Sequence, residues 1–533
     1  MSQKKKLKII DITDTWRQYE EGKEYKKRIN LYNTVNENER FYRGDQWYGV
    51  NSNGLSTPVF NVVKRIINHL INSVASTEIM VVYSDDNIPY VTDEAELEEI
   101  REMVKILNQW LTYRWEKCKM ETLTRKSLLD AAVSGDGVFY SYWDVSMHTG
   151  QSYTGDLAVS LIDNVNLFPA DVNSTDIQSQ EYIILAGRAN TESLKREAAE
   201  YGVPEADAEG ITPDDTADQA GDYSVYENTD TAALKSTYLI KFYRDEDGYV
   251  VWEKSVKNTI ICSVTTELRM YPVAYYNWES TKNSCHGTAP VSGLIQNQKY
   301  INKAYAMAMK HMIDTAFSKV IYDKKLIPEW TNEVGQAIGV ISGGDVSNAV
   351  KIIGTGEMQN DFMPLLENTL EQTKALMGAT DVAIGEVIPN NTSAILALQE
   401  TSAITLETIR SNMYQCIEDI ANIWIDMMCA YYNNDRRICY RDENGVERAE
   451  CLNIKKLKDV LIRARVDIKP AIKQSQVALI DMLGKLLNSG HITFRQYLER
   501  LPDGIIPNRQ ELINEIKIET EEKLNGKFET VGT

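Results

Sequence analysis

Residues 287–317 read GTAPVSGLIQNQKYINKAYAMAMKHMIDTAF, and the rest of the chain reads as support for this stretch and the elements that follow it. Apolar residues recur every three or four positions, which predicts one long amphipathic helix over residues 287–318. At about 1.5 Å per residue it would span roughly 40 Å, which is long for a helix inside one compact core. The predicted apolar stripe is Leu294, Ile301, Tyr305, Ala308, Met312 and Ala316. The charged residues on a different face are Lys299, Lys303, Lys310 and Asp314.

An insert and a second helix follow. Short β-branched runs at 319–323, 335–344 and 350–353, bounded by Gly and Asp, predict strands joined by turns. Residues 364–379 predict a second helix, with an inward face of Leu365, Leu366, Leu370, Thr373 and Met377. The simplest interpretation of this stretch is an ordinary helical core that carries a hairpin insert.

A loop and a third helix complete the stretch. Residues 382–393, VAIGEVIPNNTS, form a predicted loop, because Gly385 and Pro389 prevent helix continuation. Val387 and Ile388 place apolar side chains at its tip. Residues 391–393 can cap the third helix, which we expect to run unbroken to residue 432. Its predicted apolar stripe is Ile395, Leu398, Leu406, Ile409, Met413, Ile417, Ile420, Trp424, Met427 and Tyr431.

The composition excludes several classes of protein. The 533 residues include 57 basic and 77 acidic side chains, and the net charge of −20 argues against a protein that grips nucleic acid by its phosphates. It does not exclude a protein that lets DNA pass without sticking. No stretch is apolar enough to cross a bilayer, and no signal peptide is expected. Seven scattered cysteines without a CxxC pair indicate free thiols in a reducing cytoplasm and no zinc site.

Motifs for catalysis do not stand out. The chain has no GxxxxGK[ST] loop, no HExxH and no GxSxG, so we expect no ATP-binding motor, no enzyme and no cofactor. The five histidines are isolated along the sequence. Asp214 and Asp215 fall within residues 197–234, an acidic stretch rich in Pro, Gly and Thr that predicts a loosely ordered loop.

The N-terminal part predicts an amphipathic helix that leads into NENERFYRGDQW at residues 36–47, followed by a second helix over residues 58–75. Gly44 can adopt a left-handed cap conformation, while Phe41 and Trp47 bury beside the second helix. Without further information this is a helix-turn-helix packing unit.

The remaining segments predict a mixture of helices and strands. A strand at 79–83 precedes a helix over residues 93–134. The next strands are expected at 135–143, 156–168, 182–188 and 235–266, the last with a hairpin turn at 245–248. Residues 437–447 predict a hairpin, and 460–468 a strand that returns to the earlier sheet. Helices broken at 489–490 and 501–504 follow.

The order of these elements resembles the portal proteins of tailed double-stranded DNA bacteriophages. The resemblance rests on residues 287–432, on the RGDQW turn at 43–47, on NLFPAD at 166–171 and on residues 482–502. It implies a mixed α+β, helix-rich, elongated protomer that assembles into a ring. The implied parts are the wing (1–286, with the acidic loop 197–234), stem helix (287–318), clip (319–362), second stem helix (363–381), tunnel loop (382–393), wing again (394–470), and crown and C-terminal tail (471–533).

The resemblance also implies a function. Such a protein forms a channel, usually of twelve subunits, at one capsid vertex, through which double-stranded DNA is packaged and later ejected. The implied partners are other copies of the chain, the large subunit of the terminase, the major capsid protein and the head-tail adaptor or tail proteins, with no membrane. The implied location is the virion, and the host cytoplasm during assembly.

Two groups of residues are assigned by the resemblance. The tunnel loop would contain Ile384, Gly385, Glu386, Val387, Ile388, Pro389, Asn390 and Asn391. The stem residues that could face the channel are Lys299, Lys303 and Lys310.

Two other interpretations stay open at this point. One is another phage connector or scaffold-like ring protein. The other is a hydrolase or nuclease whose carboxylate site has no recognisable motif. A ring with a central hole in electron micrographs favours the portal or the connector, and a compact monomer favours the enzyme.

Overall fold

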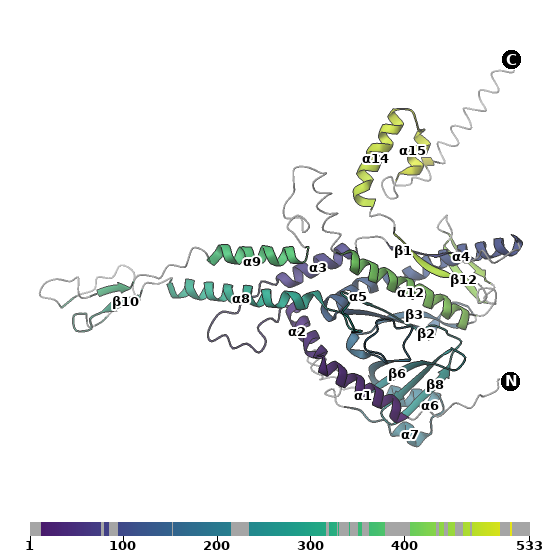
Figure 1. Cartoon of the computed structure of the whole chain (residues 1–533), viewed down its shortest axis with the longest axis horizontal. Coiled ribbons are helices and arrows are strands. Elements are labelled where there is room, and N and C mark those ends of the chain that lie inside the picture. Colours follow the sequence, from purple (N-terminus) through teal and green to yellow (C-terminus); the bar gives the residue numbers. More distant parts are fainter. Residues whose placement is uncertain are drawn as a thin grey trace, which may run out of the picture. The chain divides into compact units, whose positions relative to one another are not determined.

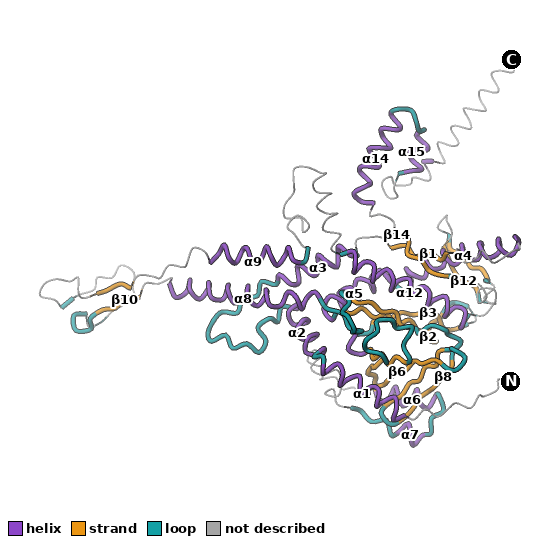
Figure 2. Tube along the Cα trace, in the orientation of Figure 1, coloured by secondary structure: helices purple, strands orange, loops and turns teal. Residues whose placement is uncertain are grey.

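The computed structural model of the chain describes residues 12–75, 79–84, 94–151, 153–214, 234–315, 319–327, 329, 340–341, 350–353, 362–378, 406–432, 436–441, 446–452, 462–468, 472–501 and 512–513. These residues form a mixed α+β protein, as predicted (Figure 1). The chain divides into two compact units, one of Met1–Ala75 with Val81–Val466 and one of Ser76–Met80 with Asp467–Thr533. Figure 2 distinguishes the helices from the strands.

The first unit begins with three helices, α1 (Ile12–Arg28), α2 (Leu31–Arg43) and α3 (Val62–Val74). α1 and α2 are separate because Asn30 has a left-handed backbone, with φ of 58°. α2 ends at Gly44, whose φ of 99° confirms the predicted cap. Phe41 is buried as predicted, and the half-buried Trp47 donates its ring N–H to the carbonyl of Pro58 at 2.9 Å.

The helix predicted over residues 93–134 is two helices, α4 (Glu94–Lys117) and α5 (Met120–Ser134). Lys119 between them has φ of 53°. The prediction of one helix is wrong because a left-handed lysine ends α4 without any Gly or Pro to signal the break.

The first larger sheet is antiparallel and has the strand order β3-β2-β9. Its strands are β2 (Asp136–His148), β3 (Thr154–Leu161) and β9 (Val273–Asn277). α12 (Glu407–Tyr431) packs against β2 and β9. Trp424 of α12 is fully buried and donates its ring N–H to the hydroxyl of Ser141 at 3.2 Å. Truncating such a side chain to Ala costs about 3–5 kcal/mol, so α12 and this sheet form one core.

The second larger sheet is also antiparallel, with the order β4-β5-β6-β7-β8. Its strands, preceded by the short 3-10 helix η1 (Asn164–Asn166), are β4 (Leu167–Pro169), β5 (Tyr182–Asn190), β6 (Lys235–Arg244), β7 (Val250–Val256) and β8 (Thr259–Thr265). Between β6 and β7 the carboxylate of Asp245 accepts the backbone N–H groups of Asp247 and Tyr249, at 3.0 and 2.8 Å. This is the hairpin turn predicted at residues 245–248.

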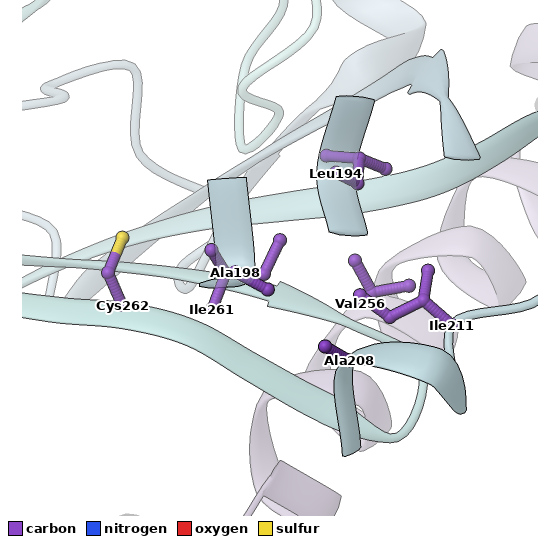
Figure 3. Packing of buried hydrophobic residues seen from close by; sticks show 7 residues of the cluster. All are labelled: Leu194, Ala198, Ala208, Ile211, Val256, Ile261 and Cys262. Carbon is purple, nitrogen blue, oxygen red and sulfur yellow. The ribbon is translucent and has the colours of Figure 1, made fainter. Parts of the chain in front are cut away.

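Part of the acidic stretch predicted to be a loose loop is ordered. α6 (Thr191–Glu200) and α7 (Glu205–Glu209) pack on the second sheet. Asp214 pairs with Arg188 at 3.0 Å and accepts the backbone N–H of Thr237 at 2.7 Å. The prediction is wrong for residues 197–214, because small apolar side chains within the acidic run are buried; residues 215–233 lie outside the described residues. The cluster consists of Leu194, Ala198, Ala208, Ile211, Val256, Ile261 and Cys262 (Figure 3).

The helix predicted at residues 287–318 is α8 (Pro290–Thr315), and the second helix is α9 (Phe362–Leu376) (Figure 1). β10 (Lys319–Tyr322) pairs antiparallel with β11 (Val350–Ile353), as expected for the insert. The strand predicted at 335–344 lies outside the described residues, except for 340–341. The stripe residues that are buried as predicted are Leu294, Ile301, Ala308, Leu366 and Thr373.

Two residues of the predicted stripes are not internal. Met312 is 58% exposed and Leu365 is 54% exposed. The assignment of Leu365 to an inward face is wrong for the isolated chain, whereas Met312 lies on the predicted apolar stripe but is exposed. The helical period identified an apolar stripe correctly, but α9 covers only part of the stripe on α8.

α12 begins at Glu407, with Leu406 at its N-cap position. The prediction of one unbroken helix from residue 394 is therefore wrong at Leu406, and residues 379–405 lie outside the described residues. Within α12 the apolar stripe from Ile409 to Met427 is buried as predicted.

Two further two-stranded sheets follow. β12 (Arg437–Arg441) and β13 (Glu447–Cys451) form the predicted hairpin. β14 (Arg463–Ile468) pairs with β1 (Ile79–Ser84) in a two-stranded sheet and does not join either larger sheet, which corrects the expected return.

The second unit contains α14 (Ile472–Asn488) and α15 (Phe494–Arg500). Gly490, with φ of 75°, lies at the predicted break between them. Thr493 caps α15 in a capping box with Gln496. The small core of this unit is Leu483, Leu498, Leu501 and Ile513.

Candidate functional site

α8 and α9 form an antiparallel pair. Asn297 of α8 donates to the hydroxyl of Thr373 at 3.1 Å, and a Cβ added to Gly293 would lie 3.3 Å from the terminal methyl of Met377. Further along α8 the contact with α9 is apolar. This apolar cluster consists of Ile301, Ala304 and Leu366, with Tyr305, Phe362 and Leu370 packed against it.

The base of α8, defined here as residues 290–305, is fixed to the start of α3 by Gln298. The Gln298 side-chain oxygen accepts the backbone N–H groups of Val62 and Val63 at 3.0 and 3.3 Å. Its amide nitrogen donates to the carbonyl of Phe60 at 2.8 Å. These N–H groups have no partner within α3, because they lie in its first turn. A side chain of α8 therefore caps another helix.

Two further amide contacts hold the base against α2 and α5. Asn302 donates to the side-chain oxygen of Gln46 at 2.6 Å. Asn38 of α2 donates both to the carbonyl of Val133 at 2.7 Å and to the hydroxyl of Ser292 at 2.9 Å. These amide side chains are almost completely buried, so losing one partner leaves an unsatisfied polar group at a cost of about 1–3 kcal/mol. The RGDQW turn thus positions α8.

Asp136, at the start of β2, organises the chain just before α8. One carboxylate oxygen lies 2.7 Å from Nδ1 of His286 and 2.9 Å from the amide nitrogen of Asn164. The other accepts the amide of Asn277 and the backbone N–H of Gly287, both at 2.8 Å. Burial alone would raise the pKa of Asp136, but the hydrogen bonds from His286, Gly287 and Asn164 outweigh it and the pKa is lowered. The charged carboxylate joins β2, η1, β9 and the segment leading into α8.

Gly135 and Gly287 let two backbone segments cross beside this carboxylate. A Cβ on Gly135 would lie 2.5 Å from the carbonyl oxygen of Gly287, and the φ of Gly135 is 99°. Both the space and the backbone conformation require glycine there.

Lys26 of α1 is buried a short distance along the same network. Its ammonium donates to the carbonyls of Asn164, Val165 and Leu167 at 2.8, 2.9 and 2.6 Å, and lies 3.8 Å from the ring centroid of Phe168. Burial lowers the pKa of Lys26 to about 7. Lys26 therefore ties α1 to the start of the second sheet.

The predicted channel lysines do not share one environment. Lys299 pairs with Glu37 of α2 at 2.6 Å and lies 5.4 Å from the ring centroid of Phe41. Lys303 and Lys310 are exposed on another side of α8. The predicted tunnel loop, Ile384–Asn391, lies outside the described residues.

Sequence reasoning missed the polar cluster around Asp136. His286 was expected to be isolated, yet it pairs with a carboxylate 150 positions away. The one sequence signal was the pair Gly135-Asp136 directly before a strand. The described cluster is a buried junction rather than an open site, and in the described ranges no three His, Cys, Asp or Glu side chains are grouped to hold a metal ion.

The fold and the site define a structural class of protein. An α+β body holds a helix pair that carries a strand insert, and the contacts at the base of this pair are structural. Residues 17–488 match the phage P22-like portal protein family, and the chain belongs to that family. No curated protein matches it.

Membership in the family establishes the function. The chain is a bacteriophage portal protein, the head-tail connector of the capsid, and acts in packaging of the viral genome. The family is structural rather than enzymatic, and its members assemble as rings with capsid and DNA at the capsid vertex of the virion. None of the helices that the structure describes has the length and apolar character to cross a membrane.

Proposed function

We propose that twelve copies of the chain form the channel, with α8 and α9 as stem helices and the β10–β11 insert as the clip. The observation that carries this proposal is the α8–α9 pair, which is held at its base by buried polar contacts and carries the paired strands beyond its other end. A pair anchored at one end and exposed at the other is suited to line up with copies of itself around an axis.

We assign the remaining parts of the chain by the resemblance to portal proteins. The wing comprises residues 1–286 and 394–470, and the crown and tail comprise residues 471–533. In the host cytoplasm the clip docks the large subunit of the terminase, and after packaging it docks the head-tail adaptor or tail proteins. The wing contacts the major capsid protein.

DNA passes through this channel without sequence preference. The net charge of −20 on each chain is repeated around the ring and repels phosphate, which keeps friction low. Of the lysines predicted to form a compensating basic band, Lys299, Lys303 and Lys310, we keep Lys299 and Lys310 as its candidates. Nanomolar, sequence-specific binding of duplex DNA at physiological salt contradicts this part of the proposal.

The test is native mass spectrometry with electron microscopy of the purified chain at micromolar concentration. The expected result is a closed ring of twelve subunits with a central hole. Finding only the 60.5 kDa monomer under several salt conditions contradicts the proposal.

The tunnel loop has its own test. Replacing residues 387–391 by a Gly-Ser linker should leave ring formation intact and impair DNA packaging or retention. Loss of ring formation would show that Val387 and Ile388 belong to the core. Wild-type packaging and retention in intact rings would show that this loop is not the tunnel loop.

A further inference from the structure

One side of α8 is covered by no described element of the chain. α9 covers the side with Ile301 and Ala304, and α2 and α3 cover the side with Gln298 and Asn302. The remaining side contains Gln296, Tyr300, Lys303, Met307 and Lys310, all exposed and spaced by three or four residues. This spacing is the signature of one continuous helix face. Within it, Met307 is 53% exposed, and Lys303 makes no ion pair with any described residue.

α9 also has an uncovered flank, and it is acidic. Its residues Met363, Glu367 and Glu371 are exposed and recur every four positions. Met363 is 42% exposed, and neither glutamate is ion-paired among the described residues. A methionine and a carboxylate on α9 therefore match a methionine and an ammonium on α8 in chemistry.

The two stripes also match in height along the helix pair. Two contacts, Gly293–Met377 and Asn297–Thr373, fix the register: moving four residues forward along α8 corresponds to moving four residues back along α9. Continuing this register places Lys303 level with Glu367 and Met307 level with Met363. Both pairs are thus in register for a neighbour whose helix pair runs parallel to the first.

The stripes lie on opposite faces of the two-helix layer. With 100° between successive helical residues and the α8–α9 contact fixed by Ile301 and Leu366, the Lys303 stripe projects from one face and the Glu367 stripe from the other. They cannot meet within one chain. Complementary patches on opposite faces join copies head to tail, which closes into a ring when the repeated rotation between copies adds up to a full turn without a rise along the axis.

We propose that Lys303 and Met307 of one copy pack against Glu367 and Met363 of the next copy. This contact rests on the proposed ring and names the surface that joins its stem helices. It assigns Lys303 to the junction between copies rather than to the channel wall. Half-exposed methionines bring adaptable apolar area, and the ion pair sets the register.

The test is a charge exchange. K303E places two carboxylates at each junction, and E367K places two ammonium groups there, whereas the double variant K303E/E367K restores one of each. Native mass spectrometry and analytical ultracentrifugation then measure the concentration at which half of the chains are in rings. We expect each single variant to raise this concentration at least tenfold. The double variant should bring the concentration most of the way back to the wild-type value.

Two controls keep the outcome specific. K282E changes an exposed lysine in the loop between β9 and α8, and should leave assembly unchanged. Circular dichroism should show the wild-type fold in every variant, since the changed side chains are exposed. Single variants that form rings like the wild type, or a double variant no better than the singles, overturn this junction while the portal ring stands. A wild-type chain that forms no ring overturns the proposed ring itself.

Discussion

The two ends of α8 have different surroundings. At the base, residues 290–305, the chain surrounds the helix: Leu294 is 1% exposed, and Gln298 and Asn302 are buried in hydrogen bonds. At the outer end, defined as residues 307–313, Met312 and Ile313 face solvent in the single chain, and Ile313 is 64% exposed. The buried side of the base is complete in one copy, whereas the outer end exposes apolar side chains that a neighbouring copy could cover.

This comparison separates two kinds of defect. A substitution of a buried residue at the base should lower the stability of the single chain. A substitution at the outer end should leave that stability unchanged and act on assembly. Measuring unfolding and assembly separately therefore tests the division.

The largest effect is expected in the buried polar cluster around Asp136, beside the segment that leads into the base of α8. Asp136→Ala removes the buried carboxylate that pairs with His286 and accepts the backbone N–H of Gly287, which should lower the free energy of unfolding by about 3–5 kcal/mol. Urea unfolding followed by tryptophan fluorescence measures it. The control is Asp45→Ala at an exposed position, expected within about 0.5 kcal/mol of the wild type. Equal effects at both positions would refute the role of the cluster.

The same carboxylate gives a pH dependence. The pKa of Asp136 in the folded chain is below its ordinary value of 3.8, so its stabilising contribution is complete above pH 3.8 and is lost as the pH falls through the folded-state pKa. Asp136→Asn has no such titration. The difference in unfolding free energy between the wild type and Asp136→Asn should therefore shrink as the solution is acidified below pH 3.8. A difference that is constant down to pH 2 argues against a lowered pKa.

A matched pair of truncations compares the two ends directly. Leu294→Ala removes a fully enclosed side chain and should cost about 2–5 kcal/mol. Ile313→Ala removes an exposed one and should change the stability of the single chain by less than about 1 kcal/mol. Comparable losses at the two positions would mean that the single chain covers the outer end after all.

Two glycine substitutions, compared with each other, isolate the effect of steric crowding beside Asp136. Gly135→Ala combines a left-handed backbone with a collision against the Gly287 carbonyl, and we expect a loss of about 2–4 kcal/mol. Gly49→Ala has a φ of 72° but no atom within 4 Å, so it should cost only about 1 kcal/mol. Thermal unfolding of the two variants gives the comparison. If they lose the same stability, the close approach of the two backbone segments contributes nothing.

The smallest effect is expected at the ion pair on the rim of the base. Lys299→Ala removes a pair with Glu37 in which both side chains are about half exposed, so solvent screens it and the loss should stay below about 1 kcal/mol. Salt should reduce the effect further. A loss above 2 kcal/mol in urea unfolding would place Lys299 among the fixed contacts of the base.

Much of this architecture follows from local pattern. The periods of 3.6 and 2 residues predicted α8, α9, the buried stripe of α12 and the two hairpins, because these signals lie within one element. The break at Lys119 could not be predicted, since lysine rarely adopts a left-handed backbone, whereas asparagine adopts it more readily and Asn30 was a weak signal of the other break. The order of residues 197–214 depends on Val256 and Ile261, which are distant in sequence.

The candidate site was predicted only in outline. The stripe pattern of α8 identified Met312 as apolar surface but did not say whether its partner belongs to the same chain. Asp136 and His286 are far apart along the chain, and only the fold brings them to 2.7 Å. The predicted tunnel-loop residues remain a prediction.

We infer above all that neighbouring copies cover the exposed face of α8 around a channel. A cryo-electron microscopy reconstruction of the assembled wild-type chain tests it most directly. We expect a closed ring in which the α8–α9 pairs surround the central hole and the face of α8 with Lys303 and Met307 lies against α9 of the next copy. A monomer, or a ring in which that face of α8 remains open to solvent, would contradict it.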